Sequence, residues 1–126
     1  MEIMRKKSKL RISYSHSHFL EIDYEFEVRG DCFVCHTGIT TAGILYNGDV
    51  FPCISVPRLP HLVQGNVRVR DFCDVWENEF KLFRNPNRTQ NDECGKCEKW
   101  EFCFGGAFHT WNHEENKQNL CLEGLK

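Results

Sequence analysis

The first thirty residues carry two runs in which apolar and polar residues alternate. Residues 10–14 and 20–28 place an apolar side chain at every second position, which is the period of a half-buried β-strand. The polar positions are basic in the first run and acidic in the second, and opposite charges stabilise paired strands. We therefore expect a basic arm and a hairpin within residues 1–30. The serine-rich turn between the strands carries His16 and His18, which could form a metal pair but are more often simply exposed in such a turn.

A second hairpin is predicted at Asn47-Gly48, which joins two strand-like runs at 40–46 and 49–53. Asn-Gly between such runs favours a type I′ turn, in which both central residues have positive φ. The chain would fold back on itself there. This would return Cys53 to the neighbourhood of the Cys-Phe-Val-Cys segment that precedes the hairpin.

A tight turn is expected at 65–66, followed by a helix from Asp71 to about Arg84. Asp71 is a residue type that caps helix N-termini well. The apolar residues of this segment share one face of a helical wheel: Phe72, Val75, Trp76, Phe80 and Phe83. Cys73 lies at the edge of that face and is more typical of a small core residue than of a ligand, whereas Glu79 falls inside the apolar arc without an evident reason.

Composition narrows the class of protein. The chain has 126 residues, a net charge of −2 and eight cysteines, so it is expected to form one domain with an appended arm. This charge gives no support for a nucleic-acid partner or a membrane surface, and no apolar run is long enough to span a bilayer. The absence of a signal peptide predicts a cytoplasmic protein, in which cysteines bind metals more often than they form disulfides. A disulfide scaffold remains the alternative if an export signal has been removed.

The cysteines are most concentrated near the C-terminal end. Cys94, Cys97 and Cys103 form a CX2CX5C run that is followed at once by two glycines, and Cys121 adds a fourth thiol. Four thiolates suit either Zn²⁺ or an iron–sulfur cluster, and the spacing does not decide between them. The predicted fold class is therefore α+β: a small metal-stabilised domain with β-hairpins and one or two short helices around cysteine metal sites.

From Cys35 to Cys121 the sequence resembles the SPASM domain, the auxiliary-cluster module that ends many radical-SAM enzymes acting on peptides and proteins. The first half of that family's pattern is met by Cys35, twelve residues, Gly48, four residues and Cys53. The CX2CX5C run and the final cysteine meet the second half. The resemblance implies a division into residues 1–30, an arm and hairpin outside the family's pattern, and 31–126, a SPASM-like auxiliary-cluster domain.

The resemblance also implies which cysteines act together. One [4Fe–4S] cluster would be held by a complete set of ligands: Cys94, Cys97, Cys103 and Cys121. A second set would comprise Cys32, Cys35 and Cys53, but its fourth position is Ala107, which has no donor atom. That site could be open to water or substrate, could take a nearby imidazole such as His109 or His36, or could be lost, with its cysteines merely buried.

A radical-SAM enzyme needs a CX3CX2C motif, and this sequence has none. The chain is therefore not expected to be a radical-SAM catalyst by itself. The resemblance instead implies a radical-SAM catalytic domain or chain as partner and a peptide or protein as substrate, with the cluster domain serving electron transfer and substrate positioning. The alternative is a structural zinc-binding interaction domain without a redox role, and zinc could also replace a natural cluster in recombinant protein.

Overall fold

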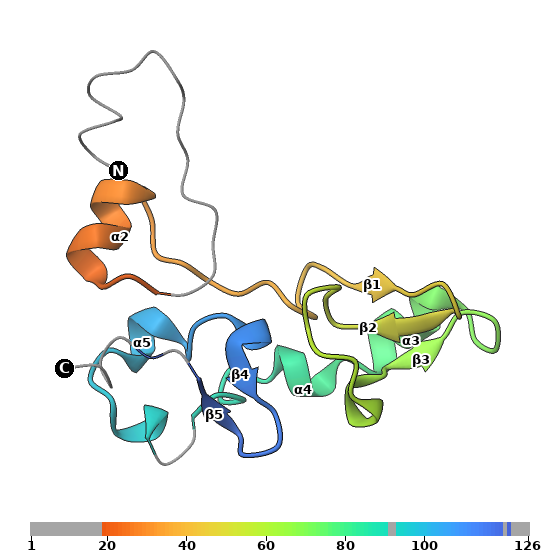
Figure 1. Ribbon diagram of the computed structural model, residues 1–126. Coiled ribbons are helices and arrows are strands. Elements are labelled where there is room, and N and C mark those ends of the chain that lie inside the picture. Colours follow the sequence, from red (N-terminus) through yellow and green to blue (C-terminus); the bar gives the residue numbers. More distant parts are fainter. Residues whose placement is uncertain (1–18, 91–92, 120, 122–126) are drawn as a thin grey trace.

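Four short helices and two small antiparallel sheets make up the described part of the chain, residues 19–90, 93–119 and 121 of this computed structural model (Figure 1). The helices are α2 (Ile22–Val28), α3 (Phe72–Asn78), α4 (Lys81–Arg84) and α5 (Trp100–Cys103). The strands are β1 (Gly43–Ile44), β2 (Asp49–Phe51), β3 (Gly65–Asn66), β4 (Trp111–Asn112) and β5 (Lys117–Gln118). Single turns of 3-10 helix lie at Pro60–Leu62, Cys94–Lys96 and Phe108–Thr110. The predicted α+β class is confirmed.

The predicted hairpin around Asn47-Gly48 is present, but its turn type is different. Strands β1 and β2 pair antiparallel, and the pairing continues with a hydrogen bond of 2.8 Å from Leu45 N to Asp49 O. Within the loop only Gly48 has a positive φ, at 91°, and its N–H donates to Leu45 O. The loop is therefore a three-residue connection with one left-handed glycine rather than a type I′ turn.

Gly65-Asn66 is not a tight turn. These two residues form β3, which pairs with β2 through Val50↔Gly65 and Asp49↔Asn66. A Cβ on Gly65 would lie 2.9 Å from a methyl group of Val75 in α3, so glycine here allows the helix to pack closely on the strand. The chain turns after this strand instead, where Val69 N–H donates to Asn66 O at 3.0 Å.

The helical segment that begins after Asp71 is confirmed, with a break after α3. The Asp71 carboxylate accepts a hydrogen bond of 2.8 Å from Cys73 N, as an N-cap does. Helix α4 follows the break, and Glu79 at the break forms an ion pair with Arg70 at 2.6 Å, which accounts for its place in the apolar arc. Cys73 is exposed, so its prediction as a core residue was wrong.

The core gathers apolar residues from both halves of the chain. Its buried members come from β2, the following loop, α3, α4 and the 3-10 turn before β4: Val50, Phe51, Val56, Leu62, Val75, Phe80, Phe83 and Phe108. The Phe83 and Phe108 rings meet edge to face with centroids 5.0 Å apart. In Figure 1, α4 lies between the three-stranded sheet and the part that contains α5, β4 and β5.

The alternating run at 20–28 forms a helix, not a strand. Residues Ile22–Val28 are α2, in which Glu25 is fully buried while Tyr24 and Phe26 are 58% and 57% exposed. The Glu25 carboxylate ties the helix to its flanking segments: it accepts from Leu20 N at 2.7 Å and from Phe33 N at 2.8 Å, and forms an ion pair with Arg29 one turn away. The predicted hairpin partner, its turn with both histidines, and the basic arm lie outside the described residues.

None of the helices in the described ranges is both long enough and apolar enough to cross a membrane.

Candidate metal centre

The CX2CX5C run folds as a 3-10 turn followed by α5. Cys97 N–H donates to Cys94 O at 3.2 Å, which closes the turn between the first two cysteines. Cys103 is the last residue of α5, and its N–H donates to Lys99 O at 2.9 Å. All three cysteines are half-buried, and Cys121 is exposed.

Three consecutive residues after Cys103 adopt left-handed conformations. Phe104, Gly105 and Gly106 have φ values of 49°, 77° and 69°. Burial raises the pKa of the Cys103 thiol, and hydrogen bonds from the backbones of Gly105 and Gly106 oppose this rise. Such a concave run of N–H groups stabilises an anion.

The Gly105 backbone is fixed from several sides. Its carbonyl oxygen accepts hydrogen bonds from Trp111 Nε1 at 2.7 Å and from Gln118 Nε2 at 2.8 Å. Thr89 donates its hydroxyl to the preceding carbonyl, Phe104 O, at 2.8 Å. A Cβ on Gly105 would lie only 2.5 Å from Thr89 Cβ, so no other residue fits without movement.

Burial and mutual repulsion oppose ionisation of these thiols. Burial is the main cause that raises the pKa of Cys94 to about 11, and the charges of Cys121 and Cys97 raise it further. Burial also raises the pKa of Cys103 to about 11, with a further rise from Cys121 and Cys94. Cys94 therefore lies within electrostatic reach of the other three cysteines. A bound cation would reverse the balance and favour the thiolates.

The first hairpin places the segment that precedes Cys53 beside the segment that follows Cys35. Gly38 N–H donates to Pro52 O at 3.0 Å, which joins the segment after Cys35 to the segment that precedes Cys53. Ser55 N–H donates to the Cys53 sulfur at 3.5 Å. The hairpin thus returns Cys53 towards Cys35.

Cys32 follows α2 and is positioned by the buried Glu25. That carboxylate holds the next residue, Phe33, through its N–H. Burial, Glu25 and Asp31 together raise the pKa of Cys32. Glu25 was missed by the sequence reasoning, although its spacing of four residues from Arg29 was a signal for a helical ion pair.

The backbone beside Ala107 reaches the upstream cysteines. Ala107 is fully buried, and the N–H of its neighbour Phe108 donates to the Cys35 sulfur at 3.3 Å. The Cys35 thiol in turn donates to the Thr37 hydroxyl at 3.2 Å. The position at which the predicted site lacks a donor therefore borders Cys35.

The family is decided by a comparison with known families. The family model described as SPASM, an iron–sulfur cluster-binding domain, matches residues 27–98, which is more than half of the chain. The chain belongs to the SPASM family. The match includes six cysteines and ends before the other two, Cys103 and Cys121. No curated protein and no solved structure matches the chain significantly.

Iron–sulfur cluster binding, the property that describes the SPASM family, fits the donor groups of this chain. Thiols are the ligands that hold such clusters, and hydrogen bonds to the sulfurs tune them. Backbone N–H groups already face the sulfurs of Cys103, Cys35 and Cys53. Within 19–90, 93–119 and residue 121, however, no three His, Cys, Asp or Glu side chains converge into a ready metal-binding group. The assignment of ligands to each site therefore remains a prediction.

The proposed imidazole ligands also remain predictions. His36 is exposed, with its Nδ1 3.1 Å from the Thr40 hydroxyl. His109 is half-buried in the 3-10 turn that follows Ala107.

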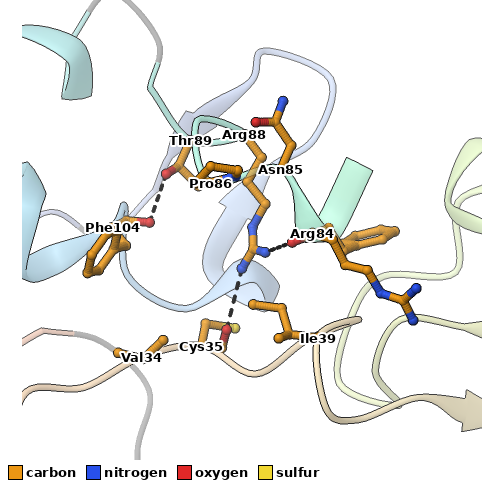
Figure 2. Close-up of a pocket in the computed structure, with 10 residues that line it drawn as sticks. Val34, Cys35, Ile39, Arg84, Asn85, Pro86, Arg88, Thr89 and Phe104 are labelled. Atoms are coloured by element: carbon orange, nitrogen blue, oxygen red, sulfur yellow. Dashed lines mark hydrogen bonds between the residues drawn. The ribbon is translucent and has the colours of Figure 1, made fainter. Parts of the chain in front are cut away.

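A cavity of about 220 Å³ borders Cys35 in this SPASM chain (Figure 2). Apolar side chains, including Val34, Ile39 and Phe104, form much of its wall, and Arg84 and Arg88 contribute two positive charges. Burial lowers the pKa of Arg88, and a charge on Cys35 opposes this shift. The cavity therefore has a largely apolar wall that also includes Cys35 and the Arg88 cation.

Proposed function

We propose that this chain is the auxiliary [4Fe–4S] cluster domain of, or a partner to, a radical-SAM enzyme that modifies peptides or proteins. The SPASM match supports iron–sulfur binding, and the left-handed turn at Cys103 is the single structural observation that carries the proposal furthest. Backbone hydrogen bonds from its two glycines oppose the rise that burial causes in the pKa of the half-buried Cys103 thiol. Donors arranged in this way favour a sulfur that carries negative charge.

The complete site in this proposal consists of four thiolates: Cys94, Cys97, Cys103 and Cys121. When bound, an iron–sulfur cluster supplies one-electron transfer at a potential set by hydrogen bonds, net charge and exposure. Gly105 and Gly106 would stabilise the charge on Cys103, and the half-buried position of the three cysteines in the run limits the access of water to them.

The upstream site would be held by Cys32, Cys35 and Cys53 and would lack a protein thiolate at Ala107. The fourth coordination position, which no protein thiolate would fill, could bind water, substrate or an imidazole. His109 is the nearest candidate imidazole in sequence. The apolar cavity beside Cys35 supports a role in substrate positioning, because a peptide side chain could enter there.

The radical chemistry itself would come from a separate catalytic domain or chain, since the sequence has no CX3CX2C motif. We propose the cytoplasm as the compartment, because free thiols for cluster binding persist under reducing conditions.

Anaerobic reconstitution with iron and sulfide tests the proposal. The wild-type protein should become brown and give the electron paramagnetic resonance signal of a reduced cluster. Cys103→Ser should lose that cluster and fold poorly, because thiolate ligation supplies on the order of 10 kcal/mol in structural sites. Cys73→Ser is the matched control, since Cys73 is exposed and lies outside both predicted sets.

A colourless protein that takes up no iron anaerobically but binds zinc tightly would contradict the redox role. It would support the structural zinc domain instead.

A further inference from the structure

Arg88 is a cation in contact with the Cys35 segment. Its guanidinium donates one hydrogen bond to Phe83 O and another, of 3.4 Å, to Cys35 O, as Figure 2 shows. It also lies over the Phe108 ring, with 5.6 Å between Cζ and the ring centroid. Within the described ranges, Arg88 forms no ion pair with a carboxylate.

These contacts join Arg88 to both residues of the hydrogen bond between Phe108 N–H and the Cys35 sulfur. It binds the carbonyl of Cys35, and it packs on Phe108, whose N–H donates to the Cys35 sulfur at 3.3 Å. The same side chain therefore orders the residue that carries the thiol and the residue that donates to it. Neither role belongs to Arg84, which instead lies over Trp76 at 4.5 Å.

We propose that Arg88 is the positioning residue of the Cys35 ligand and supplies the positive charge beside the upstream cysteine site. The inference rests on the proposed function, because it requires Cys35 to bind an iron–sulfur group. It adds a residue that holds one ligand and tunes the site without touching the iron.

The charge and the shape of Arg88 act separately. A positive charge in a partly buried site stabilises the more negative, reduced state of a cluster and so raises its reduction potential. The planar guanidinium can also bind two carbonyl oxygens at once, which an ammonium group on a flexible stem does not reproduce. Lysine at this position should therefore keep the charge and lose the positioning.

The test compares three full-length variants after anaerobic loading with iron and sulfide. Arg88→Met removes charge and hydrogen bonds, Arg88→Lys keeps the charge, and Arg84→Met removes a charge from the same cavity wall. The readouts are the reduction potential, followed by electron paramagnetic resonance, and the rate of iron release to a chelator. Melting of the unloaded proteins reports whether each variant folds.

Arg88→Met should lower the potential of the upstream site, and its iron should be held about 10- to 100-fold less tightly, as for other lost outer-sphere partners. Arg88→Lys should retain a potential close to wild type but release iron nearly as fast as Arg88→Met. Arg84→Met should match wild type in both measurements. If Arg88→Met does not fold, the iron release and potential of Arg88→Lys still decide the matter.

The inference is overturned if the Arg88 variants match Arg84→Met in both potential and iron release. It is also overturned if Cys35→Ser leaves the iron content unchanged, although one auxiliary cluster at the downstream site would then survive as a proposal. A protein that takes up no iron at all would overturn both.

Discussion

Replacing Gly105 with alanine should destabilise the protein and disturb the Cys103 sulfur. Gly105 has a φ of +77°, and a hydrogen bond from its backbone favours the ionised form of that sulfur. Alanine would keep the N–H but could not keep its position. The substitution therefore tests whether the left-handed turn is the element that organises the downstream site.

The expected cost has two parts. A left-handed conformation costs a residue with a Cβ about 1–2 kcal/mol. The new Cβ would also lie 2.5 Å from Thr89 Cβ and 2.8 Å from Trp111 Cζ2, and such overpacking costs about 1–3 kcal/mol. The sum of about 2–5 kcal/mol is a large share of the roughly 5–15 kcal/mol that holds a typical domain together.

Gly30→Ala is the matched control. Gly30 has a φ of +83°, yet a Cβ there would meet no described atom within 4 Å. It should therefore show only the conformational part of the cost, about 1–2 kcal/mol. Urea unfolding of both unloaded variants gives the difference, and iron retention after loading reports the effect on the site.

Equal destabilisation by the two alanine substitutions would refute this reasoning, because the close contacts with Thr89 and Trp111 would then have no consequence. Normal iron retention by Gly105→Ala would show separately that the N–H groups do not organise the site.

Three further predictions address the other parts of the structure. Ala107→Cys should make iron at the upstream site more resistant to chelators, because it restores a thiol at a buried position beside Cys35. Glu25→Gln should cost about 3–5 kcal/mol in urea unfolding, because it removes the charge that pairs with the largely buried Arg29 guanidinium. The unloaded protein should lose stability as pH rises from about 9 towards 11, which urea midpoints would measure. The thiols of Cys94 and Cys103 have a raised pKa of about 11 in the folded state. The same thiols therefore ionise at lower pH in the unfolded chain, and this favours unfolding.

Each of these has a clear contrary outcome. An upstream site that already holds iron firmly, and gains nothing from the added thiol, would show that another residue completes it. Glu77→Gln is the control for Glu25, since Glu77 is exposed and should change stability little; equal effects would contradict the buried ion pair. A flat pH profile would contradict the burial of the downstream thiols.

The sequence predicted the elements that local chemistry determines. The hairpin at Asn47-Gly48 and the helix capped by Asp71 are both present, since a turn glycine and an N-cap act within a few residues. The hydrophobic face of the helical segment also supplies the core, through Val75, Phe80 and Phe83. The family was predicted correctly because its pattern consists of short intervals between cysteines, which can be read directly from the sequence.

Features that depend on contacts across the chain were not predictable. The run at 20–28 alternates like a strand, yet Glu25 is buried because it binds Phe33 N–H and Arg29, which the period of the run does not encode. Gly65 is predicted to be a turn residue, but it pairs with Val50 in β2 and lies closely against Val75 of α3. The role of Arg88 likewise depends on Cys35, which lies far away in sequence.

The segment from Cys103 to Phe108 belongs to both cysteine regions. Gly106 N–H donates to Cys103 O at 2.9 Å, and two residues later Phe108 N–H donates to the Cys35 sulfur. A shift of Cys103 on ligand binding would therefore be transmitted through a short, buried backbone to Cys35. Thermodynamic linkage makes such transmission reciprocal, so occupancy of either site would change the affinity of the other. If both predicted sites bind iron–sulfur groups, this shared segment predicts that the two sites load cooperatively rather than independently.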